Sequence, residues 1–417
     1  MHDQNHNYEC PELALLAARM SEKGYRRSVI VNYKAIARQF LRYVRHVRIS
    51  IDTVQSEHVQ RFQRRRLSKY RRRHGRSPSD PQSWRAREAS AIHMLLRVLR
   101  GQWPPSPIPQ SAPESMLDEV LRGYDEWMRE IRGLCLSTRE NRIAEALRFM
   151  KSLLRIEDRA AWSDDVSISG IDGYVASRTL SRRTRGSLKL ATVDLRSFLR
   201  YLKISGWIKN DLSGEILVPK CYKLEDLPRE LRAEHVDKVL EATRADHSAI
   251  GRRDYAILTL LATYGLRAGE VIGLRLEDID WKNDILRVRR GKSGAYAELP
   301  LLPDPGNAIL AYLRHGRPKT GARQVFVRTV APYTGLAALT TQIRERLAVV
   351  GATSPGRRGP HAFRHARAAS LLRRGVTIKE IGDVLGHRST ESTAAYLRLA
   401  IDDLRTVALN LPVGVTP

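Results

Sequence analysis

The sequence predicts a mainly helical protein with one small antiparallel β-sheet in its C-terminal part. Apolar residues make up 42% of its 417 residues and recur at helical spacing along most of the chain, whereas aromatic residues account for only 6%. Two strand-like runs, 285–290 and 295–301, are joined by the turn-forming segment 291–294, which predicts a hairpin. Helices are expected over 233–245 and 253–264 before this hairpin, and further helices after it.

Two breaks between helical patterns predict three domains. Five prolines within residues 104–113 exclude a helix and favour an extended, fairly stiff linker. The second break runs from Val218 to Pro228. A chain of this length can bury a separate core in each of two or three domains. The expected domains are 1–103, 114–218 and 228–417.

The first two domains contain similar helical patterns, which predict a duplicated module. Three residue pairs recur at one constant offset: Gly24 and Gly133, Ser28 and Ser137, and Phe40 and Phe149. Each serine is expected to cap the N-terminus of a helix after a turn that contains the glycine. Amphipathic helices expected over 89–103 and 189–207 each end near a tryptophan. The alternative is that two unrelated amphipathic stretches align this well by chance.

The charge of the chain indicates a polyanionic partner. Its formal net charge is +27. The arginine-rich runs are spread along the whole chain, which favours nucleic acid over a membrane surface, because membrane binding usually needs one basic amphipathic helix or a local cluster. We therefore expect a nucleic-acid partner and no membrane partner.

Other features predict a soluble, cytoplasmic protein. The N-terminus lacks the charged start and the apolar stretch of a signal peptide. The longest apolar run, 256–266, is too short to span a bilayer. Cys10, Cys135 and Cys221 are too few and too widely spaced for a disulfide framework or a zinc site, which favours a reducing compartment.

The densest basic run, residues 61–76, is a candidate DNA-binding element. It holds nine lysines or arginines and no acid. A solvated helix face is the alternative, but such a face usually mixes charges of both signs to limit repulsion. Contact with phosphates is therefore the favoured interpretation. The candidate residues are Arg64, Arg65, Arg66, Lys69, Arg71, Arg72 and Arg73, with a smaller cluster in the second domain at Arg182, Arg183 and Arg185.

In the third domain, Arg267 directly follows the apolar helical run 256–266. A charge at the buried end of a helix is costly unless a partner compensates it. One interpretation is a simple ion pair with Glu270. The other is a guanidinium held towards a phosphate, whose oxygens match its planar array of donors.

Two further patterns are weak when each is taken alone. His361 and Arg364 lie three residues apart, so on a helix they share a face and can converge on one small ligand. Gly386 predicts a tight turn, His387 follows it, and Tyr396 comes nine residues after the histidine. The ordinary alternatives are a capping or surface histidine and a half-buried packing tyrosine.

In this order and spacing, the patterns of residues 228–410 resemble the catalytic domain of tyrosine recombinases of the phage-integrase family. The resemblance rests on the segment 265–270, the Gly291-Lys292 hairpin, the His361-x-x-Arg364-His365 motif and the spacing from His387 to Tyr396. Residues 136–141 and 194–202 resemble the family's helical core-binding domain, and 1–103 would be an additional module. The chain departs from the family pattern at Ala297-Glu298, where a basic residue often follows the hairpin lysine, and in the segment after His365.

The resemblance implies site-specific DNA recombination or integration through a covalent 3′-phosphotyrosine intermediate, with no metal, ATP or other cofactor. Tyr396 would be the nucleophile and Lys292 would protonate the leaving 5′ oxygen. Arg267, Arg364 and His387 would stabilise the transition state, and His361 would act as a general base or orient the tyrosine.

The resemblance also implies partners: double-stranded DNA with an inverted-repeat core site, and a homotetramer formed on it. Related recombinases encoded in groups on bacterial mobile elements are further possible partners. The apolar face of residues 400–409 would pack on its own domain or dock on a neighbouring protomer. Two alternatives stay open at this point: a nicking-closing enzyme like type IB topoisomerases, and a non-catalytic architectural DNA-binding protein.

Overall fold

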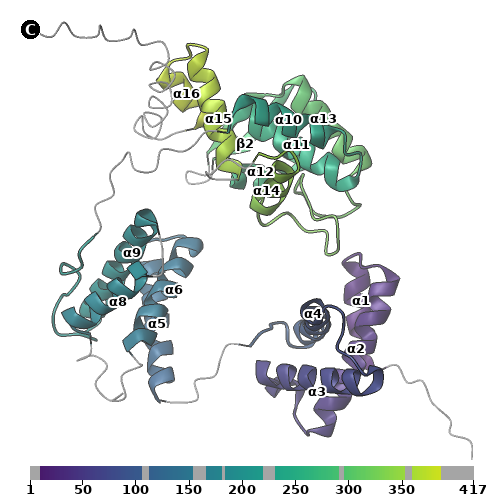
Figure 1. Cartoon of the computed structure of the whole chain (residues 1–417), viewed down its shortest axis with the longest axis vertical. Helices are drawn as coiled ribbons and strands as arrows, with labels where there is room; N and C mark the ends of the chain where they lie inside the picture. Colours follow the sequence, from purple (N-terminus) through teal and green to yellow (C-terminus); the bar gives the residue numbers. More distant parts are fainter. Residues whose placement is uncertain are drawn as a thin grey trace, which may run out of the picture. The chain divides into compact units, whose positions relative to one another are not determined.

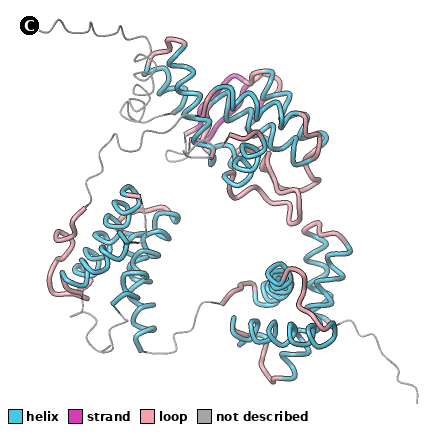
Figure 2. The backbone as a smooth tube through the Cα atoms, viewed as in Figure 1, coloured by secondary structure: helices cyan, strands magenta, loops and turns pink. Residues whose placement is uncertain are grey.

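The computed structural model describes residues 10–105, 112–153, 166–180, 184–218, 231–290, 295–352 and 359–386 (Figure 2). The chain divides into two compact units, one formed by residues 106–227 and the other by 1–105 together with 228–417 (Figure 1). Helices dominate every described part, and the strands form one small antiparallel sheet, so the predicted fold class is confirmed. Within the described residues, none of the helices is both long and apolar enough to cross a membrane.

Residues 10–105 form helices that pack around one apolar core. They are α1 (Pro11–Glu22), α2 (Arg27–His46), α3 (Ser56–His74) and α4 (Pro81–Arg100), with a short 3₁₀ turn at Ile51–Thr53. Gly75 ends α3 in the left-handed conformation, with φ of 66°. The Asp80 carboxylate then accepts the backbone N–H groups of Gln82 and Ser83, which starts α4. This short connection sets α3 and α4 against each other.

Residues 112–218 hold a second helical core. Its described helices are α5 (Ala112–Glu130), α6 (Leu136–Leu153), α8 (Ile168–Leu180) and α9 (Arg185–Ile204). The Thr184 hydroxyl accepts the backbone N–H of Ser187 and so caps α9. The first residue of this helix, Arg185, is exposed.

The predicted serine N-caps are wrong. α2 begins at Arg27 after an extended Arg26, and α6 begins at Leu136, so Ser28 and Ser137 both lie inside the first turn of their helices. The backbone of Arg26 already has the dihedral angles of a cap residue, φ −63° and ψ 144°, without any side-chain bond. The glycines do turn the chain with positive φ, and both phenylalanines are fully buried. The duplication itself stays a prediction.

The third part is a helical domain with a hairpin-based sheet. Its helices are α10 (Ala233–Arg244), α11 (Ala249–Tyr264), α12 (Ala268–Gly273), α13 (Pro303–His315), α14 (Thr340–Val349), α15 (Pro360–Arg373) and α16 (Ile378–Leu385). The apolar helix α11 packs against α10, α13 and α15, and most of its residues are buried. It therefore forms the centre of the domain (Figure 1). The first candidate arginine, Arg267, lies three residues after its C-terminal end.

The sheet has the strand order β1 (Ile279–Asp280), β2 (Ile285–Arg289), β3 (Tyr296–Pro300), all antiparallel. A 3₁₀ turn at Leu276–Asp278 leads into it. Leu286 and Val288 on β2 point into the core, as the alternation of a half-buried strand requires. Arg287 and Glu298 are cross-strand partners, and the Arg287 Nε lies 3.0 Å from the Glu298 carboxylate. Glu298, one of the two residues at which the chain departs from the family pattern, therefore pairs with an arginine of β2.

Candidate active site

A close approach between two helix ends builds the site. Gly265 caps α11 in the left-handed conformation, with φ of 63°. A Cβ atom at this position would lie 2.7 Å from Leu385 Cδ2, at the end of α16. Glycine is therefore required twice, by the turn and by the contact. The turn releases the chain so that Arg267 stands at the start of α12.

Arg267 is held by Glu270, as one of the two sequence-based interpretations expected. The Glu270 carboxylate accepts the Arg267 backbone N–H at 2.8 Å and its Nη1 at 2.9 Å. The Glu270 side chain is only 1% exposed, so it needs these charged partners. The Arg267 side chain is 35% exposed and its Nη2 also donates to the Gly386 carbonyl at 3.1 Å. The ion pair fixes the guanidinium and leaves part of it open to solvent.

Arg364 lies on α15 and is only 3% exposed. Its Nη1 donates to the Gly265 carbonyl at 2.8 Å, and its Nη2 donates to the Leu385 carbonyl at 2.5 Å. The residue thus bridges the end of α11 to the end of α16. His361, one turn earlier on the same helix, is exposed, and its ring lies 6.5 Å from that of His365 between centroids.

The structure adds Arg290, which the sequence did not single out. This residue directly follows β2, and its side chain is 12% exposed. Its Nη1 lies 3.5 Å from the Glu270 carboxylate and 3.5 Å from the Leu385 carbonyl, while Nη2 donates to the Val384 carbonyl at 3.1 Å. A Cβ atom on Gly386 would lie 2.8 Å from the Arg290 Cζ. The guanidinium therefore lies against the C-terminal end of α16.

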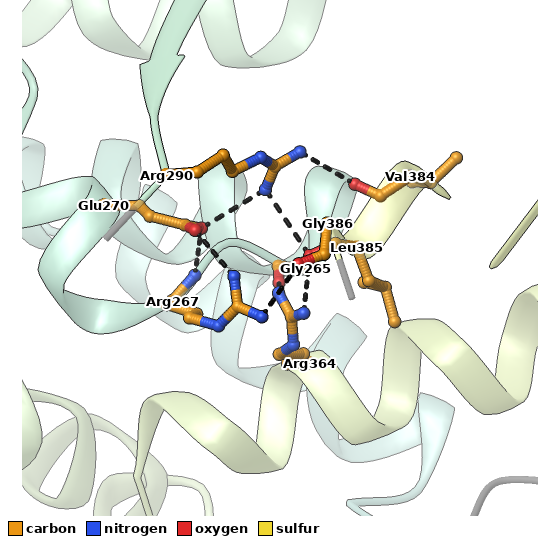
Figure 3. Close-up of polar contacts among 8 residues, drawn as sticks. All are labelled: Gly265, Arg267, Glu270, Arg290, Arg364, Val384, Leu385 and Gly386. Carbon is orange, nitrogen blue, oxygen red and sulfur yellow. Dashed lines mark hydrogen bonds and ion pairs between the residues drawn. The ribbon is translucent and has the colours of Figure 1, made fainter. Parts of the chain in front are cut away.

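Three guanidiniums thus converge on the last carbonyls of α16 (Figure 3). These carbonyls have no partners within a helix, and they carry the negative end of the helix dipole, so cations gather there. We call this arrangement the arginine clamp; it consists of Arg267, Arg290, Arg364 and Glu270, with the carbonyls of Val384, Leu385 and Gly386. It holds the C-terminal end of α16 close to Gly265 and to the end of β2.

The structure therefore brings together part of the predicted catalytic set. Arg267 and Arg364 meet at the end of α16, and His361 lies on the helix that carries Arg364. Lys292, His387 and Tyr396 lie outside the described residues, as do Arg182 and Arg183. Arg290 could have been suspected only from its place beside the Gly291-Lys292 pair, because its partners are the Glu270 carboxylate, 20 residues away, and backbone carbonyls almost a hundred residues away.

Of the predicted DNA-binding residues on α3, six are exposed: Arg64, Arg65, Lys69, Arg71, Arg72 and Arg73. Arg66 is instead half-buried, and its Nε and Nη2 donate to the Glu88 carboxylate at 2.9 and 2.6 Å. Its guanidinium also contacts Gln39 and lies 6.0 Å from the Trp84 ring centroid. Arg66 thus joins α3 to α4 within its module.

With one carboxylate among three guanidiniums, the clamp carries an excess of positive charge. Fixed guanidiniums match the shape and charge of a phosphate group. A fixed cluster of this kind in a mainly helical domain suits a protein that binds phosphate groups, such as those of DNA.

Comparison with known proteins agrees with this class. The family model described as Phage integrase family matches residues 229–402. The chain is 32% identical over 395 residues to the putative integrase/recombinase y4rA of Sinorhizobium fredii, covering 94% of this chain and 91% of that protein. It is 53% identical over 186 residues to y4gC of the same organism, also a putative integrase/recombinase, covering 45% of this chain and 97% of that protein.

Solved structures show the same fold. XerH site-specific recombinase bound to its difH substrate matches with a TM-score of 0.52 at 15% identity, covering 73% of this chain and 99% of that chain. A lambda integrase dimer bound to a COC′ core site matches with a TM-score of 0.51 at 17% identity, covering 72% of this chain and 99% of that chain.

The chain belongs to the phage integrase family. It is a tyrosine recombinase, an enzyme that cleaves and rejoins DNA in site-specific recombination, and a covalent protein–DNA intermediate is a general property of that family. The comparisons therefore favour site-specific recombination over the two alternatives left open by the sequence, a nicking-closing enzyme and an architectural DNA-binding protein.

Loss of Arg290 should slow DNA cleavage although this residue need not touch DNA. Arg290→Met removes the bonds to Val384 and Leu385, so the C-terminal end of α16 can shift. A displacement of about 1 Å can cost about 10²-fold in rate, and we expect a loss of that order in single-turnover cleavage. DNA affinity, measured by fluorescence anisotropy, should stay close to that of the wild type.

Arg287→Met is the matched control, because it removes a strand arginine whose pair with Glu298 is partly exposed. Such pairs contribute about 1 kcal/mol at most, so this variant should cleave normally. Wild-type cleavage by a folded Arg290→Met variant would contradict a positioning role for Arg290.

Proposed function

We propose that this recombinase cuts DNA with Tyr396 and holds the reacting phosphate with Arg267 and Arg364, assisted by His387, Lys292 and His361. The observation that carries the proposal is the arginine clamp. It joins both predicted phosphate-binding arginines to the carbonyls of Leu385 and Gly386. His387 directly follows Gly386, and Tyr396 lies nine residues after His387. One short segment thus links the phosphate-binding groups to the nucleophile.

The proposed chemistry is an in-line attack on a backbone phosphate. The Tyr396 oxygen forms a bond to phosphorus, and the bond to the 5′ oxygen breaks, which gives a 3′-phosphotyrosine and a free 5′-hydroxyl. Rejoining is the reverse attack by a 5′-hydroxyl, so the energy of the ester is retained. Negative charge grows on the non-bridging oxygens in the transition state, and fixed guanidiniums stabilise it without reorganising.

Arg267 and Arg364 contribute differently to this site. Arg267 is partly exposed, so its guanidinium can reach a phosphate from solvent while Glu270 keeps it in place. Arg364 is buried and donates hydrogen bonds to the carbonyls of Gly265 and Leu385. It therefore holds the ends of α11 and α16 together and adds its positive charge to the site. His361, exposed at the start of α15, would orient the tyrosine or take its proton.

Lys292 is proposed as the general acid for the leaving 5′ oxygen. Lys292→Ala should slow cleavage by about 10²–10⁴-fold, the usual contribution of a positioned proton donor. A substrate with sulfur at the 5′ bridging position needs little protonation, so it should restore most of the rate. Lys282→Ala, which removes an exposed lysine from the turn before β2, is the matched control and should respond to neither change. If the sulfur substrate gives Lys292→Ala no relative advantage, the proton comes from another group.

The proposed assembly is a homotetramer on two DNA duplexes, each with an inverted-repeat core site, in the bacterial cytoplasm at the nucleoid. A lambda integrase tetramer bound to a Holliday junction matches this chain with a TM-score of 0.50 at 17% identity, covering 74% of this chain and 85% of that chain, and its assembly supports the proposal. Residues 1–103 would be a further DNA-binding module beside the core-binding domain at 114–218 and the catalytic domain at 228–417. The exposed arginines of α3 support this role.

A further inference from the structure

The N-terminal module contains a pocket of about 640 Å³ between α2, α3 and the start of α4. This volume is in the range of ligand-binding sites rather than of packing defects. All of its lining residues come from this module. Tyr43 and Phe62 are the buried residues that line it, and the half-buried Tyr70 and Trp84 line it with His74.

Cations surround the pocket on two sides. Arg65, Lys69 and Arg73 line it from α3, where their spacing of four residues places them along one stripe of the helix. Arg42 and His46 line it from α2 by the same spacing. No acidic side chain is among the described residues that line this pocket. Its charge is therefore complementary to an anion.

The basic run of α3 is thus divided between two faces. Arg65, Lys69 and Arg73 line the pocket, whereas Arg64, Arg71 and Arg72 do not. All six are exposed, so both sets are open to solvent. A purely solvated face would not explain why one set borders a hollow lined by aromatic rings.

The aromatic side chains form a second recognition element. The Tyr70 and His74 rings are stacked, with centroids 4.3 Å apart and planes 3° apart, and the Trp84 centroid is 6.3 Å from that of Tyr70. Arg66 forms an ion pair with Glu88 and lies over the Trp84 ring, so it helps to hold Trp84 in place beside the pocket. Planar rings beside cations are the usual elements with which proteins bind unpaired nucleotides, because bases stack on rings while phosphates meet the cations.

A buried polar group at the pocket also lacks a partner. Tyr43 is 7% exposed, and its hydroxyl is buried with no hydrogen-bond partner in the described structure. Buried hydroxyls are nearly always satisfied, so this one calls for a partner, which a water molecule or a bound molecule can supply.

We propose that this pocket binds an unpaired nucleotide of a DNA strand, with its phosphate at the cations of α2 and α3 and its base against Tyr70 and Trp84. The proposal rests on DNA being the partner of this recombinase. A duplex keeps its bases stacked and presents mainly phosphates, and a run of acidic residues presents mainly carboxylates. Neither would use the ring-lined interior of the pocket.

The test uses the full-length protein and a fluorescein-labelled oligomer of eight thymidines, with affinity measured by anisotropy. The pocket variant carries Arg65→Gln, Lys69→Gln and Arg73→Gln. The matched control carries Arg64→Gln, Arg71→Gln and Arg72→Gln, so it loses the same charge from the same helix. A third variant, Tyr70→Leu, removes a stacking ring. Thermal melting checks that each variant is folded.

We expect the pocket variant to weaken oligomer binding at least tenfold more than the control variant. The wild type should prefer the thymidine oligomer to an abasic oligomer with the same phosphates by about tenfold, which is within the contribution of one stacked base. Tyr70→Leu should remove that preference. Equal losses in the two triple variants would overturn the site. Equal binding of abasic and thymidine oligomers, or equal competition by poly-glutamate, would overturn the nucleotide as its ligand.

Adduct formation by Tyr396 is measured separately on the same proteins. A wild type that binds the oligomer through the pocket but forms no adduct would contradict the proposed catalytic role and leave the pocket intact. The reverse result would contradict the pocket alone.

Discussion

Replacing Tyr396 by phenylalanine should abolish the covalent protein–DNA adduct and leave binding of the core site unchanged. The proposed mechanism gives the phenolic oxygen the only bond to phosphorus in the intermediate, and phenylalanine lacks this oxygen. A nicked suicide substrate traps the adduct, because the short cleaved strand diffuses away and rejoining is prevented. The adduct is then counted on a denaturing gel, and binding is measured by anisotropy on the intact site.

Tyr255→Phe is the matched control for this experiment. Tyr255 lies on α11 in the same domain and is half-buried, so the control makes the same chemical change away from the clamp. It should give the wild-type yield of adduct. An undiminished adduct from Tyr396→Phe would assign the nucleophile to another residue, and peptide mapping of the adduct would identify it.

Removal of the phosphate-binding arginines should reduce cleavage far more than DNA affinity. Loss of one fixed donor to a developing negative charge typically costs about 10²–10³-fold in rate. We expect at least this for Arg267→Ala and more for Arg364→Ala, which also releases Gly265 and Leu385. Affinity should change little, because the chain has 72 lysines and arginines and one lost phosphate contact lowers the slope of log affinity against log salt by only about 0.9.

Arg374→Ala is the matched control for these variants, since it removes an exposed arginine at the end of the helix that carries Arg364. Its cleavage rate should equal that of the wild type. Arg364→Ala leaves buried carbonyls without donors, so its melting temperature must be measured beside its rate. Arg267 is partly exposed, so its variant keeps the comparison valid if Arg364→Ala unfolds. Equal losses of rate and affinity would mean that these arginines only anchor DNA.

Much of the fold could be predicted because local sequence determines it. The two strand-like runs and the turn residues 291–294 predicted the hairpin, whose strands end within a residue of the expected positions. The start of α4 was placed too late, at residue 89 rather than Pro81. Asp80 followed by a proline is a strong start signal, since the carboxylate caps the helix and the proline needs no N–H there.

The arginine clamp could be predicted only in part, for a physical reason. The pairing of Arg267 with Glu270 spans one helical turn, so sequence spacing reveals it. The partners of Arg290 and Arg364 at the end of α16 are backbone carbonyls, which every residue carries. Nothing in the sequence marks such acceptors until the fold brings them near, and for this reason Arg290 was missed.

The arginine clamp also sets a limit on how this enzyme can be recombined with its relatives. Its members come from four separate stretches of sequence, between Gly265 and Gly386, and each depends on the exact path of the others. A chimera with a crossover inside this interval would combine an arginine from one parent with a helix end from the other. Crossovers before residue 231 leave the interval whole. Exchange of DNA-binding modules between such enzymes, by evolution or by design, should therefore succeed only when residues 265–386 are inherited as one block.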